Sequence, residues 1–92
     1  MVFTYDEPKR QANIAKHGFD FAEFEDAFSF DRFLSLPTQP SRITGRERFK
    51  LLGSWREETV VVVIVSPLGT EAIDIVSIRR ANPKERAAYD RS

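Results

Sequence analysis

The stretch from Glu71 to Tyr89, EAIDIVSIRRANPKERAAY, encodes a strand and a helix in immediate succession. Its first half is rich in β-branched residues, which predicts a strand over Ala72–Ile78 that runs directly into Arg79 and Arg80. Strict alternation divides this strand into two faces, one with Ile73, Ile75, Ser77 and Arg79 and the other with Ala72, Asp74, Val76, Ile78 and Arg80. The two arginines are therefore expected to differ in role, one at a functional site and the other as an anchor of the strand end.

The second half of the stretch predicts a helix whose start is specified almost residue by residue. Asn82 is a good N-cap, Pro83 occupies the first helical position, and Glu85 completes a capping box. The free N–H groups of a helix N-terminus favour anions, as do the two arginines that precede it. This corner of the molecule is suited to a phosphate group.

The composition predicts one soluble cytoplasmic domain over residues 1–92. The chain has no cysteine, no apolar run of the roughly 20 residues that a membrane span needs, and no signal-peptide pattern. Its 14 basic and 14 acidic residues cancel but are unevenly placed. Acids predominate up to Asp31 and bases from Arg32 to Glu57. This layout indicates one of two things. The protein has a basic surface for nucleic acid and a separate acidic surface, or the charges only look clustered because short segments of a highly charged sequence are always uneven.

The first third of the chain predicts a short strand followed by two helices. The strand covers Val2–Tyr5, the first helix runs from its cap Asp6 to Gly18, and the second begins at Asp20. Glu23 is the expected capping-box partner of Asp20. The apolar residues of the second helix recur with helical spacing and should face the core: Phe21, Phe24, Ala27 and Phe28.

The rest of the chain predicts three or four antiparallel strands. Arg46–Trp55 alternates cleanly, Thr59–Val65 is a continuous β-branched run that should form the middle strand, and Phe33–Leu36 is a possible further strand. With helices covering one face of this sheet, the fold class is α+β, with two N-terminal helices and a C-terminal helix on a mostly antiparallel sheet.

Three cations, Arg46, Arg48 and Lys50, share one face of the predicted Arg46–Trp55 strand. They form either an ordinary solvated face or a stripe that binds phosphate. The sequence alone leaves both interpretations open.

Three blocks of the chain resemble the BrnT family of bacterial toxins. They are the opening YDEPKRQANIAKHGFDF, the middle GRERFKLLGSWREETVVVVIV and the ending IVSIRRANPKERAAY, which occur in the family's order. Two departures are visible: the proline stands second after the capping Asp6, and the loop 37–44 is less acidic than in the family. The second departure bears on partner contacts.

The resemblance implies a RelE-like fold and a ribonuclease that arrests translation. It also implies a protein partner, a BrnA-like antitoxin of the ribbon-helix-helix class. Operator DNA would be contacted only indirectly, through this antitoxin. These expectations come from the resemblance and not from periodicity or composition.

RNA cleavage without a metal needs a base, an acid and cations that stabilise the charge on phosphorus. The candidate cations are Arg79 and Arg80, with Arg46, Arg48 and Lys50 as substrate-binding residues. His17, Tyr89 and Glu85 are the candidates for proton transfer. Each has a structural alternative: His17 can complement a helix C-terminus, Tyr89 can anchor the last helix, and Glu85 can serve only its capping box.

The sequence predicts neither a metal site nor a cofactor. One histidine, no cysteine and carboxylates at capping positions give no ligand pattern, and no glycine-rich phosphate loop is present. The competing function is a non-catalytic module that holds nucleic acid or an acidic protein on its basic strand face.

Overall fold

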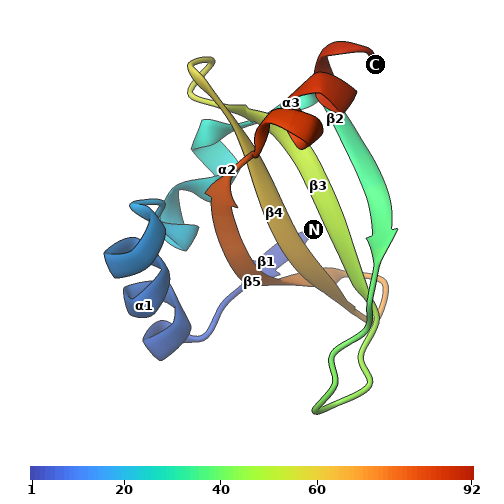
Figure 1. Cartoon of the computed structure of the whole chain (residues 1–92). Coiled ribbons are helices and arrows are strands. Elements are labelled where there is room, and N and C mark those ends of the chain that lie inside the picture. The colour runs from blue at the N-terminus through green and yellow to red at the C-terminus, as the bar shows by residue number, and fades with distance from the viewer.

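A five-stranded sheet forms the middle of the protein, with strand order β1-β5-β4-β3-β2 (Figure 1). The computed structural model describes all 92 residues. Its elements are β1 (Val2–Thr4), α1 (Glu7–His17), η1 (Phe21–Glu23), α2 (Phe24–Ala27), β2 (Phe28–Thr38), β3 (Arg48–Trp55), β4 (Thr59–Leu68), β5 (Ala72–Arg80) and α3 (Pro83–Asp90). None of the helices combines the length and hydrophobicity of a membrane span.

The valine-rich strand β4 lies at the centre of the sheet, as predicted. It pairs antiparallel with β3 on one side and β5 on the other, while β1 adds to β5 in parallel. Val61, Val62 and Val63 are fully buried because both faces of β4 are covered. A continuous β-branched run is the expected pattern for such a strand.

The helices do not share one face of the sheet, so the predicted one-sided arrangement is wrong. One core, which includes Phe21, Phe24 and Val63, lies between η1–α2 and the sheet. A second core lies on the opposite face, where Tyr89 of α3 packs against Leu52 and Val62. Helix α1 lies beside β5 (Figure 1). The face beneath α3 is thereby separated from the main core.

The second predicted helix is much shorter than expected. It consists of the 3-10 turn η1 and the single turn α2, and Phe28 already belongs to β2. Its predicted apolar face is nevertheless buried, and Asp20 caps the turn by accepting from the N–H of Ala22. Glu23, expected in a capping box, pairs with Arg56 of the β3–β4 turn. Strand pairing between Phe28 and Trp55 ends the helix early.

A β-bulge in β5 overturns the predicted division of its side chains. Ile64 pairs with Ser77 and Val65 pairs with Ile75, so Val76 is an extra residue with no partner of its own. The bulge shifts the alternation by one residue. Ile75 and Ile78 therefore both reach the main core, although strict alternation assigned them to opposite faces.

The ends of two other strands also differ from the prediction. Strand β3 begins at Arg48, so Arg46 lies in the preceding loop. Strand β2 extends over Phe28–Thr38, far beyond the predicted Phe33–Leu36, with an irregular register between Phe28 and Phe33.

Candidate functional site

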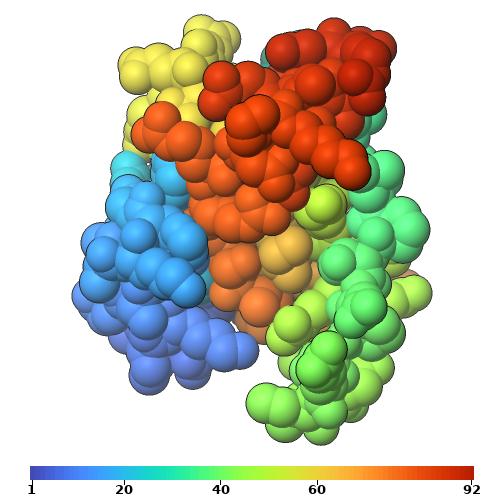
Figure 2. Space-filling view, in the orientation of Figure 1, coloured from blue at the N-terminus to red at the C-terminus, as the bar shows by residue number.

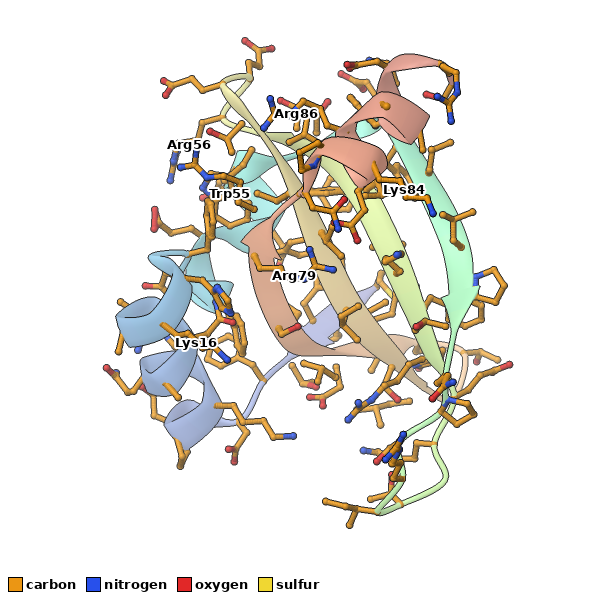
Figure 3. All side chains as sticks on the ribbon, viewed as in Figure 1. Lys16, Trp55, Arg56, Arg79, Lys84 and Arg86 are labelled. Carbon is orange, nitrogen blue, oxygen red and sulfur yellow. The ribbon has the colours of Figure 1, made fainter.

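The face of the sheet beneath α3 brings together Arg79, Lys50 and Glu85 from three different elements. The Arg79 guanidinium donates to both carboxylate oxygens of Glu85, at 2.8 Å each. The Lys50 ammonium lies 3.2 Å from the same carboxylate. Figure 3 shows Arg79 below α3, directed over the sheet. The strand register explains why Arg79 and Lys50 lie close together, because Arg79 pairs with Val62 of β4 and Lys50 pairs with the nearby Ile64.

Glu85 is held as a carboxylate by this arrangement. The hydrogen bonds from Arg79, together with the N–H of Asn82 and the Lys50 ammonium, lower the pKa of Glu85 to about 2 despite its burial. The capping box expected around Asn82 is present. A buried carboxylate with four donors orients cations and is a poor proton acceptor at neutral pH.

A second group of cations lies farther along the same face. Lys9 of α1, Arg46 of the β2–β3 loop and Arg48 of β3 line a hollow of about 180 Å³ with Ser66 and Asp74. None of the three cations forms a salt bridge. This hollow lies about 13 Å from Arg79, because Val62 and Ser66 are four residues apart on β4. We call it the cation hollow.

The loop that borders the cation hollow presents hydrogen-bond donors. The Ser41 hydroxyl oxygen accepts from the N–H groups of Ile43 and Thr44, and the Thr44 hydroxyl oxygen accepts from Arg46 N–H. Each hydroxyl retains its own hydrogen to donate. Ser41, Thr44 and the three cations together favour an anion, which Asp74 offsets only in part.

His17 and Lys16 lie on the α1 side of the same face. They line a shallow hollow with Ser77 and Val76 of β5, and this hollow shares Lys9 and Val76 with the cation hollow. Figure 2 shows the surface set back between α1 (blue), α3 (red) and the β2–β3 loop (green). Figure 3 shows Lys16 on the sheet side of α1 and Lys84 on α3 above Arg79.

Two of the predicted site residues, Tyr89 and Arg80, do not join the contacts among Arg79, Lys50 and Glu85. Tyr89 is buried in the second core and its hydroxyl donates to the Arg32 carbonyl, while the Arg32 guanidinium lies 4.1 Å from the centre of the Tyr89 ring. Arg80 pairs with Val61 of the main core, so it lies on the opposite side of β5 from Arg79 and is exposed. The opposite orientation of the two arginines was predicted.

Asn13 is a positioning residue that the sequence reasoning missed. Its side-chain amide accepts from the N–H of Ile78 and donates to the Ile78 carbonyl, which are bonds that a neighbouring strand would otherwise make. The same amide also donates to the Phe19 carbonyl. These bonds hold α1 next to the β5 segment that precedes Arg79. The helical spacing of Lys9, Asn13 and His17 could have indicated that they share one side of α1.

No group of three or more His, Cys, Asp or Glu side chains is placed to hold a metal ion. Cations outnumber carboxylates on this face, where Glu85 and Asp74 are the carboxylates that line it. The chemistry available here is binding and stabilisation of negative charge.

Comparisons with known proteins match the chain to a family and to a solved structure. A family model described as "Ribonuclease toxin, BrnT, of type II toxin-antitoxin system" matches residues 5–85. The crystal structure of the Brucella abortus ribonuclease toxin BrnT is similar, with 36% sequence identity and a TM-score of 0.71, over 89% of this chain and 99% of that one. No curated protein matches the chain.

Proposed function

We propose a specific activity for this chain, which belongs to the BrnT family of ribonuclease toxins from type II toxin–antitoxin systems. It cleaves RNA without a metal ion, through the face beneath α3, and thereby inhibits translation in the cytoplasm. The observation that carries this proposal is the convergence of Arg79, Lys50 and three unpaired cations on one hollowed face.

The proposed reaction is a transesterification at one phosphodiester. The 2′-oxygen attacks phosphorus while the bond from phosphorus to the 5′-oxygen breaks, so the products carry a 2′,3′-cyclic phosphate and a 5′-hydroxyl. One group removes the 2′-proton and one supplies a proton to the 5′-oxygen. The remaining requirement is stabilisation of the negative charge that gathers on the phosphoryl oxygens.

Arg79 and Lys50 have the position for charge stabilisation. Arg79 uses three of its N–H groups on Glu85 and on the Arg80 carbonyl, which leaves two of its five for a phosphate. Glu85 holds the side chains of Arg79 and Lys50 in place, so we assign it a positioning role. His17 is the proton-transfer residue in this proposal, because it shares a hollow with Ser77, two residues before Arg79.

The other substrate contacts belong to the cation hollow. Lys9, Arg46 and Arg48 bind the phosphate backbone at a distance from the bond that is cleaved. The antitoxin of this pair is a BrnA-like ribbon-helix-helix protein, so operator DNA is bound only through it. The family description supports the existence of an antitoxin and an RNA substrate.

The test is RNA cleavage by the purified protein, without antitoxin and with EDTA. The parent should fragment RNA, and Arg79→Lys should lower the rate about a hundredfold because lysine cannot reproduce the two-pronged geometry. Arg80→Lys is the matched control, since it changes the neighbouring arginine on the other side of the strand. Equal rates for the parent and Arg79→Lys would contradict the proposed site.

A non-catalytic binding module is the second candidate. One observation favours it: the best-placed cations, Arg79 and Lys50, are both already paired with Glu85. A parent protein that binds RNA in EDTA, leaves it intact and does not arrest growth when induced would select this alternative.

A further inference from the structure

The face of the sheet opposite the cations carries an open apolar hollow. Its volume is about 530 Å³, and its lining is dominated by apolar and aromatic side chains, among them Phe3, Phe30, Phe33, Phe49, Leu51 and Ile73. Phe30 and Phe33 on β2 retain 43% and 41% of their surface exposed. Phe24 of α2 packs against Phe28, Phe3 and Phe30, but Phe30 stays partly exposed. Exposed aromatic clusters of this kind are typical of protein interfaces.

The apolar hollow continues into an acidic one. Asp26, Asp31 and Glu57 line a neighbouring hollow that shares Phe30 with it. None of these three carboxylates forms a salt bridge, and the arginine of this hollow, Arg56, is paired with Glu23. We call the two hollows together the apolar–acidic surface. Its unpaired side-chain charge is negative, and the α-amino group of Met1 is the positive group on its lining, whereas the opposite face has unpaired cations.

We infer that the apolar–acidic surface is where the antitoxin binds, through a segment with apolar anchor side chains next to basic ones. The inference rests on the proposed function, because a type II toxin requires a protein partner. The apolar anchors fill the hollow beside Phe33, and the basic side chains meet Asp31 and its neighbours. Complementary charge of this kind selects the partner and speeds association.

A second copy of the chain is not complementary to this surface. A twofold interface places the same surface of both copies in contact. The apolar–acidic surface holds three unpaired carboxylates against one positive group, the α-amino group of Met1, so two copies would desolvate six carboxylates (three from each) with only two positive groups to offset them. RNA is disfavoured for the same reason, because its backbone is negative.

The location predicts that antitoxin binding and RNA cleavage can be separated by mutation. The test uses Phe33→Glu and Leu36→Glu, two substitutions on the same strand at side chains of nearly equal exposure, 41% and 39%. Phe33 lines the apolar hollow, whereas Leu36 pairs with Lys50 and faces the other side of the sheet. The probe is the purified small protein encoded by the adjacent reading frame.

Phe33→Glu should weaken binding of this antitoxin about a hundredfold, the effect of losing an interface hot spot. It should cleave RNA at the parent rate, and Leu36→Glu should bind the antitoxin as the parent does. Asp31→Lys, which changes charge outside the apolar lining, should weaken binding and reduce its salt dependence. Melting curves confirm that each variant is folded.

Three outcomes overturn the inference. If Phe33→Glu and Asp31→Lys bind the antitoxin like the parent, this surface is wrong while the proposed function stands. If the parent is a dimer that Phe33→Glu dissociates, the occupant is a second copy. If the parent cleaves no RNA and binds no adjacent-frame product, the proposed function itself has failed.

Discussion

At the scale of a single residue, Glu85 joins three elements through one carboxylate. It caps α3 and pairs with Arg79 of β5 and Lys50 of β3. Its folded pKa of about 2 lies below the unfolded value of roughly 4.3. The ionised group therefore stabilises the fold fully above the unfolded value, and this contribution is lost as the pH falls toward 2.

The corresponding prediction concerns Glu85→Gln. The free energy of unfolding should fall by about 2–3 kcal/mol at pH 7, and the difference from the parent should shrink below about 1 kcal/mol near pH 2.5. Urea unfolding at both pH values measures it. Glu71→Gln, at an exposed turn residue, is the control and should be nearly neutral at both. A difference independent of pH would show that the ionised carboxylate is not responsible.

At the scale of elements, the contact between β2 and β3 depends on Gly53. The Phe28 ring lies over this glycine so closely that a Cβ atom would overlap it. Gly53→Ala should therefore cost about 1–3 kcal/mol of stability, because the phenyl ring must move within a packed core. Combining it with Phe28→Leu tests the cause, since the double variant should lose less than the sum of the two single losses. Strictly additive losses would locate the strain elsewhere.

At the scale of the whole molecule, the cation hollow and the apolar–acidic surface lie on opposite faces of the sheet. If the cation hollow binds the RNA backbone, each phosphate contact there adds to the salt dependence of binding. Arg48→Gln should reduce the slope of log affinity against log salt by about 0.7, the value for one contact with a single strand. Arg80→Gln, on the other side of β5, should leave the slope unchanged. The slopes are measured with a short RNA. Equal slopes for the parent and both variants would show that the RNA backbone does not contact Arg48.

The sequence by itself determined the features that depend on neighbours a few residues apart. The caps of α1 at Asp6 and Gly18 and the capping box of α3 involve partners three or four positions away. The β-branched run of β4 likewise indicated its own burial. The resemblance to the BrnT family was also readable, because it rests on short blocks of sequence, and the family match confirmed it.

Only the tertiary structure decided what depends on register and long-range packing. Val76 becomes a bulge because of how β5 pairs with β4, and α2 stops after one turn because Phe28 pairs with Trp55. Lys50 meets Glu85 across 35 positions of the chain. A shift of one residue in strand pairing reverses every side chain beyond it, and no local pattern encodes that shift. The strand pairing thereby places the cation hollow and the apolar–acidic surface on opposite faces of the sheet.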